Sequence, residues 1–138
     1  MADGFALALQ KGLRAALVAN SDVIALVSTR VYDEPPQDVT YPYIRFNTIQ
    51  PNAFDTDTKE GALVDISIEA HSRSASGRVE ASQIAEAIKS ALHRNETAVT
   101  VTGFTLVELI FEAFYATRDN DGRGHTAVIS LQAMLETA

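Results

Sequence analysis

The stretch RDNDGRGHTAV, residues 118–128, places Asp121-Gly122 between two long runs in which apolar and polar residues alternate. This pattern predicts a β-hairpin, because aspartate and glycine accept the backbone angles of a tight turn. The flanking strands are predicted over residues 104–117 and 126–135. The residues expected to form the turn are Asp119, Asp121, Gly122 and Gly124.

The same stretch also resembles two kinds of binding loop, and both fail on spacing. In an EF-hand loop, positions 1, 3 and 5 are acidic, position 6 is glycine and position 12 is glutamate. With Gly122 at position 6, Thr117 and Val128 occupy the first and last positions and supply no carboxylate. A dinucleotide-binding loop must open a helix, whereas a strand pattern follows here. A small metal-dependent enzyme remains a remote alternative, through Asp119, Asp121 and His125.

Composition indicates a single globular domain spanning residues 1–138, with 46% hydrophobic and 21% charged residues. Cysteine is absent, which excludes disulfides, thiolate zinc sites and cysteine nucleophiles. No signal peptide and no apolar run of membrane-spanning length is found, so we expect a soluble intracellular protein without membrane contact. The formal net charge of −7 argues against binding along the DNA backbone, which requires clustered Lys and Arg.

Helical periodicity marks two main helices. The first follows Asp3, which is placed to cap it, and the second covers residues 78–93, where alanine, isoleucine and leucine recur on one face. A short helix over residues 23–27 is predicted after the break at Asn20.

Strand patterns fill most of the remaining chain. The prolines of residues 33–42 favour extended backbone, and a strand begins at Tyr43. Residues 50–62 are predicted as a loop, residues 63–71 as a half-buried strand and residues 99–101 as a short strand. The predicted fold is α+β: a mainly antiparallel sheet of four to five strands with two main helices packed on one face.

No catalytic set emerges from the sequence. There is no Gly-x-Ser-x-Gly motif, and the three histidines, His71, His93 and His125, are far apart. We therefore assign no catalytic, cofactor-binding or metal-ligating residue, and we expect a protein that is not an enzyme and needs no cofactor.

Three groups of residues in series resemble the small tail-completion, or tail-terminator, family of tailed bacteriophages, prophages and gene transfer agents. They are Arg30-Val31-Tyr32-Asp33 with Pro36-Gln37 and Pro42-Tyr43; Ser72-Arg73 with Gly77-Arg78 and Glu80-Ala81; and Arg118-Asp119 with Asp121-Gly122 and His125. The chain departs from the family pattern at His71, where an aromatic residue is expected, and at Gly124, where threonine is commoner.

The resemblance implies a structural virion protein of the tail and neck, made in the cytoplasm of the bacterial host. It implies a hexameric ring on the head-proximal end of the tail tube, which ends tube polymerisation and joins the tail to the head. The implied partners are further copies of the chain, the tail tube protein and the head-connector or stopper protein, with DNA only as passing cargo. A head-closure protein or another minor tail protein of similar architecture is the alternative.

Two segments are candidate ring or tube interfaces. Aromatic and proline residues gather before the first long strand, and such side chains are favoured at interfaces. They equally fit a loop packed against the core. The acidic residues of the 50–62 loop fit a contact with the tube end or a channel lining, or else a solvated hairpin tip. The candidate residues are Tyr32, Pro35, Pro36, Tyr41 and Tyr43 in the first segment, and Asp55, Asp57, Lys59 and Glu60 in the second.

Overall fold

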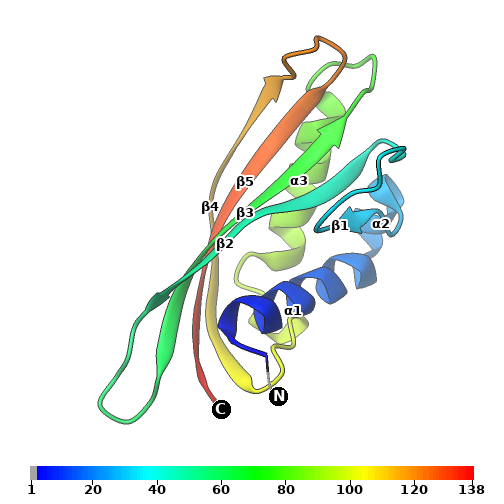
Figure 1. Ribbon diagram of the computed structural model, residues 1–138. Helices are drawn as coiled ribbons and strands as arrows, with labels where there is room; N and C mark the ends of the chain where they lie inside the picture. The colour runs from blue at the N-terminus through cyan, green and yellow to red at the C-terminus, as the bar shows by residue number, and fades with distance from the viewer. Residues whose placement is uncertain (1–2) are drawn as a thin grey trace.

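The computed structural model describes residues 3–138, which form a five-stranded sheet with three α-helices on one face (Figure 1). The predicted α+β fold with a mainly antiparallel sheet is confirmed. No helix within these residues is long and apolar enough to cross a membrane. The elements in chain order are α1 (Phe5–Ala19), α2 (Ser21–Val27), β1 (Val31–Tyr32), β2 (Tyr43–Ala53), β3 (Gly61–Ser72), α3 (Val79–Leu92), a 3-10 helix η1 (Glu96–Ala98), β4 (Phe104–Arg118) and β5 (His125–Thr137).

The strands lie in the order β1-β2-β3-β5-β4. β1 is parallel to β2, and the other three neighbouring pairs are antiparallel. β3 and β5 pair from Gly61↔Glu136 to Ser72↔His125 and form the centre of the sheet. β4 forms one edge of the sheet. β2 forms most of the other edge, because β1 covers only its first residues.

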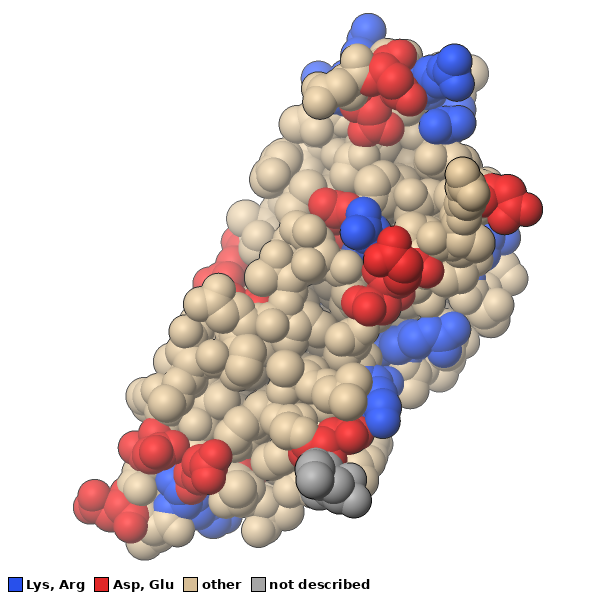
Figure 2. Space-filling view, in the orientation of Figure 1, with Lys and Arg blue, Asp and Glu red and all other residues tan. Residues whose placement is uncertain are grey.

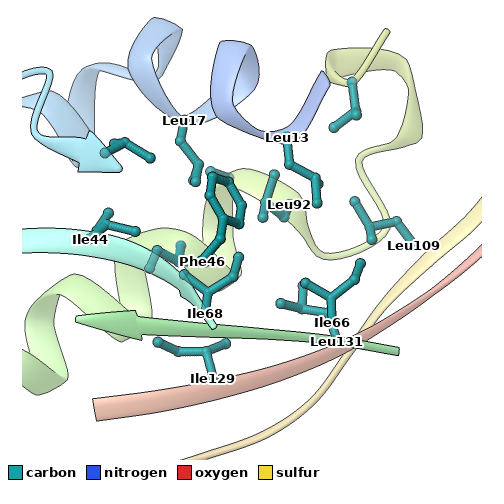
Figure 3. Packing of buried hydrophobic residues seen from close by; sticks show 14 of the residues in the cluster. Leu13, Leu17, Ile44, Phe46, Ile66, Ile68, Leu92, Leu109, Ile129 and Leu131 are labelled. Carbon is teal, nitrogen blue, oxygen red and sulfur yellow. The ribbon is translucent and has the colours of Figure 1, made fainter. Parts of the chain in front are cut away.

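The core lies between the sheet and the helices, as the alternating pattern of the strands predicted. Every second residue of β3 and β5 is buried against the helices, including Ile66, Ile68, Ile129 and Leu131. Figure 3 shows Leu13 and Leu17 of α1 pointing toward the sheet, where Phe46 points back at them. Burying one such side chain contributes about 1.5–3 kcal/mol, so this layer holds α1 and α3 on the sheet.

The helix ends differ in one respect from the sequence prediction. Asp3 does not cap α1; Gly4 is the N-cap residue and makes no side-chain hydrogen bond, while Asp3 forms an exposed ion pair with Lys11 at 2.8 Å. The prediction for α2 is confirmed, because the Asn20 side chain accepts hydrogen bonds from the first backbone N–H groups of that helix. α3 begins and ends within one residue of its predicted bounds.

The loop predicted over residues 50–62 is shorter than expected. β2 continues through Pro51 to Ala53 and pairs with the start of β3, so that only residues 54–60 are outside the strands. Proline is tolerated there because β2 has no neighbour on its outer side at that point, and an edge position needs no N–H. Residues 53–62 therefore form the end of a long hairpin that extends beyond the helices (Figure 1).

The short strand predicted over residues 99–101 is wrong. These residues follow η1 without joining the sheet, while Val99 and Val101 are buried in the core. The apolar pattern of these residues therefore arises from their burial in the core and not from pairing with another strand. Conversely, the two-residue strand β1 was not predicted, because it is too short to show a period.

Candidate functional site

An aromatic cluster surrounds Tyr43 at the start of β2. The Tyr43 ring stacks on His71 at 4.8 Å between centroids, and Tyr41 meets its edge at 5.1 Å. Tyr32 lies 6.0 Å from Tyr43, and the Arg73 guanidinium sits 4.2 Å over the Tyr41 ring. His71 thus supplies an aromatic surface against the Tyr43 ring.

Only part of this cluster is available to a partner. Tyr43 is buried, and that burial raises the pKa of its hydroxyl to about 12, with neighbouring Tyr41 adding in the same direction. Tyr32, Pro35 and Tyr41 are half-buried, while Pro36 is exposed. Tyr43 is therefore covered by Tyr41 and His71 on the sheet face opposite the helices, outside the hydrophobic core. The exposed surface centres on Pro36 and its acidic neighbours, residues 33–38, which we call the Pro36 segment.

The turn between β4 and β5 lies beside this cluster. Asp119 Oδ1 accepts a hydrogen bond from the Thr126 hydroxyl at 2.6 Å, and Asp121 Oδ1 accepts one from the Arg123 N–H at 2.9 Å. Asp121 also lies 3.8 Å from Arg73. The two carboxylates thus hold the turn and tie it to the aromatic cluster. Among residues 3–138, no three His, Asp or Glu side chains are grouped to hold a metal ion.

The two turn glycines are required for different reasons. Gly122 has φ of +71°, the left-handed region, and a Cβ there would meet open space. Gly124 has ordinary backbone angles, but its Cβ would lie 2.4 Å from the carbonyl oxygen of Ser72. The turn therefore packs directly on the end of β3, which explains why glycine occupies position 124.

The acidic loop, residues 54–60, lies at the opposite end of the molecule (Figure 1). All its residues are exposed, and Phe54 leaves 46% of its surface in solvent. Asp55 accepts the Gly61 N–H at 3.1 Å and so shapes the loop, while Lys59 reaches Glu136 of β5 at 3.5 Å. The carboxylates of Asp57 and Glu60 form no hydrogen bond with the described residues, so their charges are available to a partner.

The structure therefore divides the sequence-predicted interface residues between two ends. In Figure 2, acidic and basic atoms gather at both ends of the long axis, and a further group lies in the middle of the face between them. The aromatic cluster and the β4–β5 turn form one end, and the acidic loop forms the other.

The edge of β4 carries contacts that the sequence did not reveal. Leu109, in the middle of this edge, donates its N–H to Glu96 Oε2 at 3.0 Å and accepts the Arg94 N–H at 2.8 Å. Phe111 donates its N–H to His93 Nδ1 at 2.9 Å. These contacts, which we call the β4 clamp, block the middle of the edge.

Within residues 3–138, each side of the sheet has a stretch of edge without a hydrogen-bonded neighbour. On β4, residues 113–118 lie beyond the β4 clamp, and we call their outer side the upper β4 edge. On β2, residues 48–53 lie beyond the two residues paired with β1, and we call their outer side the lower β2 edge. Open strand edges are templates for pairing with another chain, so both are candidate interaction surfaces.

Comparisons with known proteins agree with the overall fold. A chain from a solved structure described as the virion of a native gene transfer agent particle superposes with a TM-score of 0.85 at 26% sequence identity, covering 96% of this chain and 99% of that chain. A search of curated proteins gives no match. The family model described as tail completion protein gp17 matches residues 11–136. The chain belongs to this family of tail completion proteins.

Proposed function

We propose that the chain is a structural protein of the virion that forms a ring of six copies on the head-proximal end of the tail tube. There it ends tube polymerisation and joins the tail to the head connector. Family membership and the similarity to a chain of a gene transfer agent virion support a tail protein. The ring, its copy number and its place on the tube are the proposal.

The observation that carries the proposal is the separation of two unlike surfaces along the long axis. A protein between a tube and a connector needs two such surfaces. We propose that the acidic loop meets the tube, through Asp57, Glu60 and the exposed ring of Phe54. The Pro36 segment and the β4–β5 turn then face the connector.

The role requires no chemistry from the chain. The ring acts by shape, by capping one end of a polymer and offering a surface to the next component. DNA passes through it without specific binding, and the acidic net charge of −7 favours such passage. We further propose that the chain folds and acts as one domain, made in the host cytoplasm and retained in the virion.

Deleting the gene tests the role. Loss of a terminator gives tails that are abnormally long or not joined to heads, measured as tail lengths by electron microscopy. Normal-length tails beside leaky heads would instead identify a head-closure protein and overturn the proposal.

Charge-neutralising variants at the two ends test the orientation. Asp57→Asn with Glu60→Gln should impair length control. The matched pair Asp33→Asn with Glu34→Gln, which are exposed residues of the Pro36 segment, should leave tail length normal and impair head joining. The reverse pattern would invert the proposed orientation.

A further inference from the structure

We propose that neighbouring copies in the ring join through their sheets, the upper β4 edge of one copy pairing with the lower β2 edge of the next. The sheets then form one continuous barrel. This inference rests on the ring proposed above and names the surface that closes it. The occupant of each open edge is a second copy of this chain.

The β4 clamp shows which backbone N–H and C=O groups of β4 face away from β5. Leu109 directs its N–H and C=O away from β5, toward Glu96 and Arg94. Backbone direction alternates along a strand, and the bulge between Phe111 and Ala113 shifts the alternation by one residue. Phe114 and Ala116 therefore turn their N–H and C=O groups toward the open edge.

The outward-turned groups on β2 follow in the same way from its far end. Phe54 directs its N–H inward to the Gly61 carbonyl at 2.9 Å. Ala53, Pro51 and Ile49 therefore turn toward the open edge. The missing N–H of Pro51 then costs the β2–β3 ladder no hydrogen bond, which agrees with this assignment.

On both edges, the residues with open backbone groups have their side chains on the same face of the sheet. Phe114 and Ala116 lie on the helix side of the sheet, packed against the core. Pro51 and Ala53 lie on the same side, because they pair with the buried residues of β3. Residues opposite each other in an antiparallel pair must share a face. The open groups on the two edges therefore can form hydrogen-bonded pairs, whereas a mismatch in face would forbid them.

The two edges also match in direction. Three antiparallel steps separate β2 from β4, so the two strands run in opposite directions within one copy. A ring keeps all copies in one orientation, because it turns each copy about a single axis. β4 of one copy therefore meets β2 of the next in the antiparallel sense that the rest of the sheet already has.

The positions of the two open edges along their strands determine how far the strands tilt from the axis of the proposed barrel. Within one copy, Phe114 lies level with Phe46. Pairing Phe114 with Pro51 or Ala53 of the neighbour shifts that copy along the strands by about four to six residues, or roughly 13–20 Å. One copy contributes four strand spacings, roughly 19 Å across. The ratio gives a strand tilt of about 35–45°, the range found in closed β-barrels.

The barrel also fixes which face lines the channel. Six copies with four strands each give a backbone radius of roughly 24 Å at this tilt. Helices outside leave an opening of roughly 35–40 Å, wide enough for duplex DNA, whereas a helix layer inside narrows it to less than ~20 Å. The channel is then lined by the sheet face opposite the helices, where Asp65, Glu69 and Glu108 outnumber Arg45. Such a lining does not retain phosphate groups.

Cysteine cross-linking tests the pairing directly, because the chain has no cysteine of its own. Tyr115→Cys with Asn52→Cys places thiols opposite each other across the proposed joint, and Tyr115→Cys with Gln50→Cys covers the alternative register. Within one copy these positions lie on opposite edges of the sheet, with β3 and β5 between them. We expect oxidation of the assembled ring to give covalent ladders of up to six copies for one of the two pairs.

Single-cysteine variants are the matched controls and should give no ladder. Efficient covalent dimers from Tyr115→Cys alone would show β4 pairing with β4 across a two-fold axis and would overturn the inference. Rings that assemble normally but give no ladder with either pair would also overturn it, while leaving the proposed ring intact. Absence of any ring on tube ends would instead count against the proposed function itself.

Proline variants supply a second, independent measurement. Ala116→Pro and Ala53→Pro each remove an N–H that points to solvent in the single chain, so the internal ladders stay complete. We expect either change to raise the concentration needed for assembly by at least about tenfold, with Ala116→Ser and Ala53→Ser as controls that keep the N–H. Proline variants that fold and assemble like the serine controls would refute the edge pairing.

Discussion

Replacing Glu96 by alanine should open the β4 clamp, and its cost can be worked out from the contacts. The Glu96 carboxylate accepts the Leu109 N–H at 3.0 Å, and Leu109 is fully buried. The change leaves a buried backbone donor without a partner, which costs about 1–3 kcal/mol. For a domain of this size, the midpoint of thermal unfolding should fall by roughly 3–12 °C.

The assay combines thermal unfolding with amide hydrogen exchange. The Leu109 amide should exchange faster in Glu96→Ala, whereas Glu96→Gln keeps an acceptor oxygen and should lose less stability. Glu112→Ala is the matched control, because Glu112 is an exposed residue at the bulge of the same strand. A free energy of unfolding for Glu96→Ala within about 0.5 kcal/mol of this control would refute the role of the clamp.

Two further predictions concern the turn and the aromatic cluster. Gly124→Ala should cost about 1–3 kcal/mol in chemical unfolding, because its Cβ meets the Ser72 carbonyl, whereas Gly122→Asn should be close to neutral, since asparagine tolerates positive φ. Equal effects would contradict the close approach at Gly124. Because the pKa of Tyr43 is raised from 10 to about 12 in the folded chain, its contribution is present below pH 10 and is lost as the pH rises through 12. The free energy of unfolding should therefore fall less steeply between pH 10 and 12 in Tyr43→Phe than in the unchanged chain. An equally steep fall would show that the hydroxyl is not buried.

The parts of the fold that were predictable are those specified by local periodicity. β3 and β5 alternate because one face of each strand is buried, and their inward residues are readable without knowledge of any partner. α3 is similarly specified by its own apolar stripe. In contrast, Val99 and Val101 show that an apolar pattern alone cannot distinguish pairing from packing.

The β4 clamp was not predictable for a different physical reason. His93 and Glu96 look like ordinary residues at the end of a helix, and their partners lie 18 and 13 residues further along the chain. Only the packing of α3 against β4 brings them together. The same holds for the open edges, because which strand lies at an edge depends on the order of the sheet. Edge protection follows from topology, which a single sequence does not display.

The strength of the proposed joint bears on when the ring forms. Pairing residues 113–118 with residues 48–53 supplies about five backbone hydrogen bonds, since Pro51 lacks one donor. At about 0.5–1.5 kcal/mol each, they give roughly 2.5–7.5 kcal/mol, against an association cost of about 4–15 kcal/mol. One joint therefore offsets only part of the cost over most of this range and gives a weak pair of copies, whereas the last copy entering a ring makes two joints at a single association cost. Contact with a tube end further lowers the cost by aligning the copies, so cross-linking at the joint should be much stronger with tubes than without them. Equal cross-linking in both conditions would mean that the ring assembles before it meets the tube.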